Sequence, residues 1–132
     1  MTSLTFKDSL KGYQDSDFFK TLEINRGIER ESLRVNQEGQ ISQSAHPKDL
    51  GSPLTNPDIT TDFAEALVEL VTPTFSSAEG LFNHLSDLHH FLYSTMGDEI
   101  LWNFSMPCAF NSPEEIRIAE YGSSNSGMLK HV

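Results

Sequence analysis

A chain of 132 residues is long enough for one domain of ordinary size, and its evenly spread aliphatic and aromatic residues argue against a disordered tail. Its net charge of −10 disfavours nucleic acids and anionic membranes as partners, because both require a basic surface. One cysteine excludes an internal disulfide and a cysteine-based metal cage. The sequence has neither a signal-peptide core nor a run that spans a bilayer, so we expect a cytoplasmic protein.

The first part of the chain predicts two helices before any strand. Residues 3–12 suit a short helix, and residues 15–17 offer a cap for a second helix that carries Phe18, Phe19, Leu22 and Ile24. A strand over residues 29–35 follows, and the polar residues 36–40 close it as a turn that leads to a partner segment near Ile41. Residues 45–58, rich in proline, glycine, serine and asparagine, are expected to be a loop.

Two carboxylates, Glu29 and Glu31, stand two residues apart within this predicted strand. On a strand such residues share a face, whereas on a helix they would be turned apart by roughly 200°. We favour the strand. Its glutamate face also carries Leu33 and Val35, so half of that face is apolar and we expect it to point inward.

Two simpler interpretations of this segment stay open. A helix would place Arg26, Arg30 and Arg34 in a solvated basic stripe, because four-residue spacing keeps side chains on one helical face. In the second interpretation, Glu29 and Glu31 are surface carboxylates that form ion pairs with Arg30 and Arg34. Spacing alone favours this interpretation over a functional site shared by the two glutamates.

A second acidic stretch lies at residues 59–73. From residue 66 to residue 71 it is apolar except for Glu69, and Pro73 ends it, which predicts a buried strand interrupted by one acid. Burying a charge without a partner costs several kcal/mol, so we expect Glu69 to be paired, protonated or bound to a cation. Glu65, in the same stretch, suits a solvent-facing position equally well and is left out of the candidate site.

The second half of the chain predicts a long helix followed by shorter elements. Residues 76–79 form a capping box for a helix that ends near residues 96–97, and its apolar stripe should pack on the sheet. A strand is expected over residues 100–104, Cys108 is expected to be a small buried residue, and residues 112–115 begin a short helix that ends near Tyr121. Residues 122–127 form a small-residue loop that would hold an anion or, equally well, act as a connector.

The histidines invite a metal interpretation that their spacing does not support. His46 lies beside a turn proline and is favoured as a solvated turn residue. His84, His89 and His90 are favoured for structural or surface roles, since the adjacent His89 and His90 diverge on a helix.

Five motifs in series resemble one family. They are RGIERESLRV (26–35), the His46-Pro47 and Leu50-Gly51-Ser52 turn, ITTDFAEALVELVTP (59–73), Leu101-Trp102 with SMPC (105–108), and YGSSNSG (121–127). In this order and with similar spacings they are similar to bacterial-type glutamate–cysteine ligase (γ-glutamylcysteine synthetase), the first enzyme of glutathione synthesis. Members of that family are several times longer, so residues 1–132 would be the amino-terminal part of the catalytic domain, apparently truncated.

The resemblance implies a fold, a reaction and a set of ligands. The expected fold is α+β, an incomplete antiparallel sheet like the catalytic funnel of glutamine synthetase with flanking helices. The expected reaction joins the γ-carboxylate of L-glutamate to the amine of L-cysteine, with ATP as co-substrate first making γ-glutamyl phosphate. The expected cofactor is Mg²⁺ or Mn²⁺, and the metal-binding residues implied by their place in the motifs are Glu29, Glu31, Glu69 and Asp62.

The residue types suit that role. Two carboxylates about 4 Å apart repel by roughly 4 kcal/mol at an effective dielectric near 20, so a cluster of them needs a cation. Mg²⁺ prefers oxygen ligands of this kind.

The remaining metal ligands, the adenine site and most of the cysteine site are expected beyond residue 132. The isolated chain should therefore be inactive. Two alternatives remain. In the first, the chain is a catalytically silent remnant that binds a protein partner or self-associates through unpaired sheet edges. In the second, it belongs to a related carboxylate–amine ligase that uses another amine.

Overall fold

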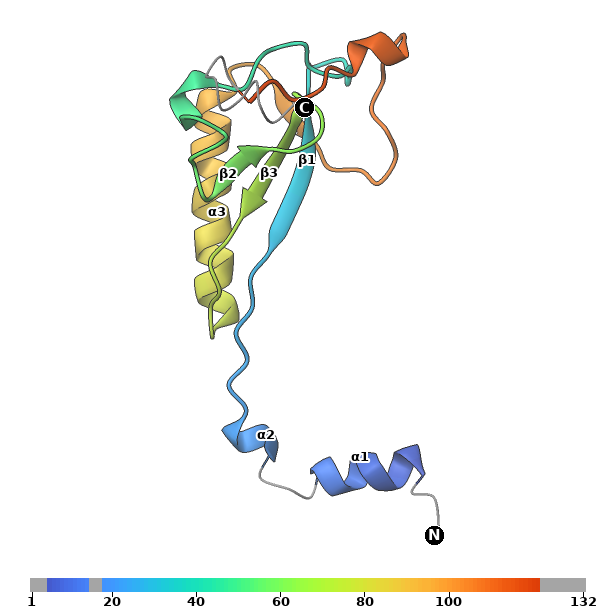
Figure 1. Cartoon of the computed structure of the whole chain (residues 1–132), viewed down its shortest axis with the longest axis vertical. Helices are drawn as coiled ribbons and strands as arrows, with labels where there is room; N and C mark the ends of the chain where they lie inside the picture. Colours follow the sequence, from blue (N-terminus) through green and yellow to red (C-terminus); the bar gives the residue numbers. More distant parts are fainter. Residues whose placement is uncertain (1–4, 15–17, 122–132) are drawn as a thin grey trace.

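The computed structural model describes residues 5–14 and 18–121, which form an open antiparallel sheet with a long helix on one face (Figure 1). The four strands lie in the order β2-β3-β1-β4. The elements are α1 (Phe6–Gln14), α2 (Phe18–Thr21), β1 (Glu29–Val35), the 3-10 helix η1 (Lys48–Leu50), β2 (Ile59–Thr61), β3 (Leu67–Val71), α3 (Ala78–Thr95), β4 (Ile100–Trp102) and the 3-10 helix η2 (Pro113–Glu115). The expected α+β class with an open antiparallel sheet is confirmed.

Strand β1 is central to the sheet. It pairs along most of its length with β3, and its last three residues pair with β4 on the other side. The predicted strand over residues 29–35 is confirmed, and the helical alternative for this segment is wrong.

Helix α3 covers one face of the sheet and forms the main hydrophobic core there (Figure 1). Leu88 and Leu92 of α3 cluster with Val68 and Leu70 of β3, and the cluster extends to residues from each neighbouring segment, namely Leu50, Ile59, Met96 and Leu101. Alternation along β3 directs these apolar residues to the helix and leaves Glu69 on the opposite face.

A second, smaller cluster lies at one end of that opposite face. It contains Val35, Ile41, Ala66 and Cys108, with Trp102 packed against it. Cys108 is buried as expected, and burial raises the pKa of its thiol, so the side chain packs as a small apolar group. Only the Val35 end of β1 is therefore buried on this face.

The ends of α3 confirm the capping signals. Ser77 is the N-cap, and its hydroxyl accepts a hydrogen bond from the backbone N–H of Gly80 at 3.0 Å. Met96 is the C-cap of α3. The next residue, Gly97, has a φ of 62°, a left-handed conformation that glycine adopts without steric cost.

Several sequence expectations are wrong or incomplete. The glutamate face of β1 does not point inward: Glu29 and Glu31 are exposed, because α3 covers the other face. The second helix is only the single turn of α2, so Leu22 and Ile24 lie in an extended segment outside it. The helix expected after residue 112 is the 3-10 turn η2, and the short strand β2 was not expected as a separate element.

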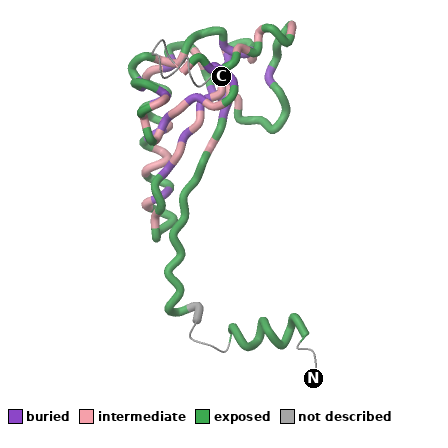
Figure 2. The backbone as a smooth tube through the Cα atoms, viewed as in Figure 1, coloured by how far each residue is buried: buried purple, intermediate pink, exposed green. Residues whose placement is uncertain are grey.

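Helix α1 contacts α2 and stands apart from the sheet and α3 (Figures 1 and 2). It corresponds to the helix predicted over residues 3–12, but it begins and ends later in the sequence, and it contains no buried residue. None of the helices in the described ranges is both long and apolar enough to cross a membrane.

The core under α3 generates a stability prediction. Leu92 is 0 % exposed, so Leu92→Ala should lower the free energy of unfolding by about 2–5 kcal/mol through lost burial and the cavity left behind. Phe82 lies on the same helix but is 68 % exposed, and Phe82→Ala should change stability by less than about 0.5 kcal/mol. Urea unfolding of both variants measures the difference, and equal losses would contradict the assigned core.

Candidate functional site

Strands β1 and β3 present their glutamates on the face of the sheet opposite α3. Glu31 lies directly opposite Glu69 in the antiparallel register, and Glu29 lies two residues along β1, opposite Val71. Residues directly opposite each other have Cβ atoms about 4.5–5.5 Å apart. The pairing therefore makes Glu31 and Glu69 cross-strand neighbours, with Glu29 on the same face.

The arginines of β1 are engaged on the helix-covered face. The Nε–H of Arg30 donates to Nε2 of His89 at 3.1 Å, and its guanidinium also bonds to Asn103. The guanidinium of Arg34 pairs with Glu99 at 2.8 Å. The interpretation in which these arginines bridge Glu29 and Glu31 is therefore wrong.

Asp62 follows β2 directly and lies close to Tyr121. Its backbone N–H donates to the carbonyl of Leu67 at 3.0 Å, and its backbone carbonyl accepts from the Tyr121 hydroxyl at 3.1 Å. Burial raises the pKa of Tyr121, and the nearby carboxylates of Asp62, Glu69 and Glu65 raise it further. Acidic groups from two segments thus surround one phenol.

Within residues 5–14 and 18–121, the histidine, cysteine and acidic side chains form no group of three or more that could hold a metal ion. The described part of the chain therefore contains no finished metal centre. Metal ligation by Glu29, Glu31, Glu69 and Asp62 stays a prediction.

Glu65 is a buried structural carboxylate that sequence reasoning missed. Its two carboxylate oxygens accept hydrogen bonds from the backbone N–H groups of His46 at 2.9 Å and Glu120 at 2.7 Å. The same segments are joined by backbone hydrogen bonds from Glu65 to Arg117 and from Ala119 to Phe63. Glu65 therefore fixes residues 117–121 against the end of β2. Only its place in the motif at residues 59–73 hinted at this role.

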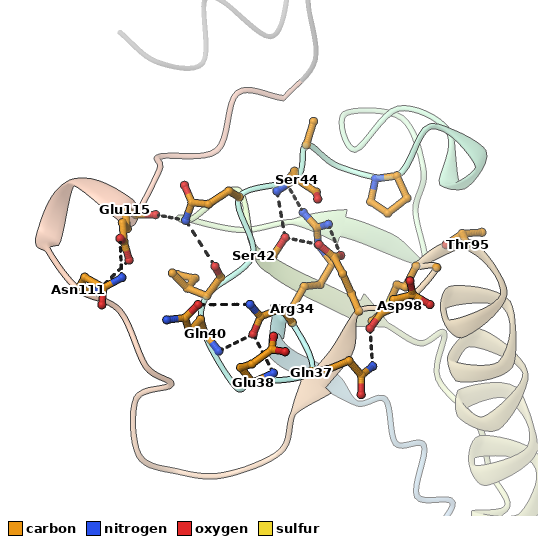
Figure 3. A pocket seen from close by; sticks show the side chains of 18 residues that line it. Arg34, Gln37, Glu38, Gln40, Ser42, Ser44, Thr95, Asp98, Asn111 and Glu115 are labelled. Carbon is orange, nitrogen blue, oxygen red and sulfur yellow. Dashed lines mark hydrogen bonds and ion pairs between the residues drawn. The ribbon is translucent and has the colours of Figure 1, made fainter.

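Arg34 forms the centre of a second buried polar network, beside a pocket of about 760 Å³ (Figure 3). Besides pairing with Glu99, it donates to the carbonyls of Ser44 at 2.9 Å and Glu65 at 3.0 Å, and Ser42 bonds to the same Glu99. The pocket is lined by the turn after β1 and the end of α3, and it contains none of the four predicted ligands. We regard it as a by-product of this structural network.

The histidines have structural surroundings. Nδ1 of His89 bonds to the carbonyl of Leu85, and the Nε–H of Arg30 donates to its Nε2, so His89 is held between helix and sheet. His46 is half-buried, not solvated, and its Nδ1 bonds to the hydroxyl of Thr61 at 2.8 Å. His84 contacts the ring of Phe75, whereas His90 is exposed.

The anion loop expected at residues 122–127 and the following Lys130 lie outside the described residues.

Removing the Glu65 carboxylate should destabilise the protein. Glu65→Ala leaves two partly buried backbone N–H groups without their acceptor and should cost about 2–4 kcal/mol. Glu38→Ala, which alters an exposed glutamate in the turn after β1, should cost less than about 0.5 kcal/mol. Denaturant unfolding compares them. A Glu65→Ala loss no larger than that of the control would show that the carboxylate does not hold the two segments.

His46 predicts a pH dependence of stability. Its pKa is lowered below 6.5 by burial and by the charge of Arg34, and Glu65 opposes this only in part. The unfolded chain therefore binds the proton more readily, so stability falls as pH drops through about 6.5. His46→Asn should lose less stability than the parent protein between about pH 7.5 and about pH 5.5, whereas His90→Asn should match the parent. Unfolding at both pH values tests this, and an unchanged pH dependence in His46→Asn would contradict it.

Comparison with known proteins agrees with the motifs. A family model described as glutamate-cysteine ligase matches residues 9–132. The glutamate–cysteine ligase of Pseudomonas putida KT2440 is 54% identical over 106 residues, which cover 80% of this chain and 20% of that protein. The corresponding enzyme of Saccharophagus degradans is 50% identical over 109 residues, covering 83% of this chain and 21% of that protein.

Solved structures show the same relationship. The glutamate–cysteine ligase of Francisella tularensis in complex with AMP superposes with a TM-score of 0.74 at 46% identity, covering 80% of this chain and 21% of that one. A bifunctional glutathione synthetase from Pasteurella multocida gives a TM-score of 0.67 at 37% identity, covering 71% and 13%. The chain thus spans about a fifth of the length of the curated relatives it matches. The matching residues and the shared fold together place the chain in the glutamate–cysteine ligase family.

Proposed function

We propose that this chain is the amino-terminal part of the catalytic domain of a cytoplasmic, ATP-dependent glutamate–cysteine ligase. The reaction joins the γ-carboxylate of glutamate to the amine of cysteine through γ-glutamyl phosphate. Family membership supports the reaction, and the complex of the Francisella tularensis enzyme with AMP supports a nucleotide substrate. The observation that carries the proposal is the register that sets Glu31 directly opposite Glu69 on the face away from α3.

That arrangement suits a divalent cation. Like charges directly opposite each other on a sheet are destabilising, and Glu29 and Glu31 on this face are exposed. Carboxylate oxygens are the donors that Mg²⁺ and Mn²⁺ prefer, so the residues present fit such an ion. Glu29, Glu31, Glu69 and Asp62 would hold it, and groups from the rest of a full-length ligase would complete the site.

When bound, the cation supplies charge neutralisation at the transferring phosphoryl group. The residues of this chain would hold the cation in place. Strand pairing fixes Glu31 and Glu69 relative to each other, and the hydrogen bonds between residues 62–65 and residues 117–121 hold Asp62 near Tyr121. Carboxylates on paired strands keep their positions better than carboxylates on loops, which limits reorganisation during the reaction.

The unpaired sheet edges support a second candidate. In the described chain β2 and β4 are the edge strands, and exposed edges favour association with another strand. A catalytically silent chain would use these edges to bind a protein partner or a second copy.

A chimera tests the catalytic proposal, with residues 1–132 replacing the matching fifth of the Pseudomonas putida enzyme. Glu31→Gln in the chimera should lower kcat/KM by at least about 100-fold and raise the Mg²⁺ concentration required, because it removes a charged ligand. A coupled ATPase assay with glutamate and cysteine measures both.

Glu38→Gln serves as the matched control, since Glu38 is exposed in the turn beyond β1, and it should leave the rate unchanged. The isolated chain should give no turnover above background. An active chimera that tolerates Glu31→Gln, or turnover by the isolated chain, would overturn the proposal.

A further inference from the structure

Strand β1 turns polar side chains toward α3. Alternation directs Arg30, Ser32 and Arg34 to the helix-covered face. Within residues 5–14 and 18–121, the hydrophobic cluster under α3 includes no residue of β1. Apolar packing is non-directional and does not set the position of β1 against the helix. Hydrogen bonds, which are directional, set it instead.

The half of β1 that carries Glu29 and Glu31 is paired on one side only. Residues 29–33 pair with β3, whereas pairing with β4 begins at Leu33. In the part of the chain that the structure describes, no strand pairs with residues 29–32 on the β4 side. Hydrogen bonds to β4 therefore do not fix the backbone beside the two glutamates.

Arg30 connects this half of the strand to two neighbours. Its Nε–H donates to Nε2 of His89 on α3 at 3.1 Å, and its Nη2 donates to the side-chain carbonyl of Asn103, directly after β4. The His89 ring is held on the helix in turn, because its Nδ1 bonds to the carbonyl of Leu85 at 2.8 Å. Arginine presents its donors in a rigid planar fork, so these bonds fix both the distance and the direction of the strand.

We propose that Arg30 is a positioning residue for the metal site. Through His89 and Asn103 it holds the glutamates on either side of it in the arrangement that binds Mg²⁺ or Mn²⁺. Arg30 lies between Glu29 and Glu31 in the chain, so any rotation of this segment moves both carboxylates. Ligands held by such outer contacts reorganise less when the cation binds. The inference rests on the proposed function, because the metal site is itself proposed.

The charge of Arg30 on its own would act in the opposite direction. A guanidinium near a metal site repels the incoming cation, so removing its charge should tighten metal binding. Removing its positioning contacts should weaken metal binding. The sign of the change in metal affinity therefore distinguishes the two roles.

Mn²⁺ binding tests the proposal in the chimera described above and in the 132-residue chain, followed by the EPR signal of the free ion. Arg30→Met should raise the apparent Kd by at least about 5-fold, since groups that orient metal ligands contribute about 10- to 100-fold and Arg30 acts through the strand. Lys48→Met is the matched control, because it removes one positive charge from the exposed start of η1, and it should leave the Kd unchanged.

Variants of the two partners of Arg30 perturb the fold less. Asn103 is exposed, and Asn103→Ala should raise the Kd by a smaller factor than Arg30→Met. His89→Ala should raise the Kd, whereas His90→Ala, which alters an exposed neighbour, should not. Adding His89→Ala to Arg30→Met should have little further effect, because the two residues act as one unit.

Activity of the chimera separates positioning from loss of folded protein. Arg30→Met should raise the Mg²⁺ concentration required for half-maximal activity by at least about 5-fold and keep kcat at saturating Mg²⁺ within about 2-fold. A loss of folded enzyme would lower kcat and leave the Mg²⁺ requirement unchanged, which would contradict the proposal.

Glu31→Gln distinguishes a failure of this inference from a failure of the proposed function. If Glu31→Gln leaves Mn²⁺ binding unchanged, the metal site is wrong and the role of Arg30 falls with it. If Glu31→Gln weakens Mn²⁺ binding but Arg30→Met leaves it unchanged or tightens it, only the positioning role is overturned.

Discussion

The pairing of β1 with β3 is the constraint on which the rest of the structure depends. One register decides both faces of the sheet: Val68 and Leu70 meet α3, and Glu69 therefore meets Glu31 on the opposite face. A slip of one residue would exchange the two sets, placing acids in the core and leucine in solvent. The burial of apolar side chains under α3 thus holds the acidic residues in position, although none of those acids contributes to the core.

Two buried polar networks fix the segments that the sheet does not pair. Arg34 ties β1 to residues 42–44 and to Glu99 beyond α3, and Glu65 ties the end of β2 to residues 117–121. A buried ion pair contributes little net stability, because desolvation offsets much of its attraction. Its effect is on arrangement: each partner satisfies the other's hydrogen bonds in one geometry, so the irregular segments adopt that geometry.

The sequence predicted the periodic elements, because strand alternation and helix capping are local properties. Alternation placed Glu29 and Glu31 on one face, and the capping signals placed α3. Only the resemblance to the family joined Glu69, on another strand, to that pair. The sequence did not reveal which face of the sheet α3 covers. Leu33 and Val35 make one end of the glutamate face of β1 apolar, and this pattern is the same whether a helix or a loop packs on that end. It also missed Glu65, whose burial depends on backbone N–H groups 19 and 55 residues away.

The one-sided layering of the sheet has a consequence for biosynthesis. The core under α3 is built from residues 50–101, a single continuous stretch of the sequence. Sequences near in the chain meet sooner than distant ones, and amino-terminal units collapse while synthesis continues. The core on the helix-covered face therefore depends on contacts within this one stretch, which form early in folding.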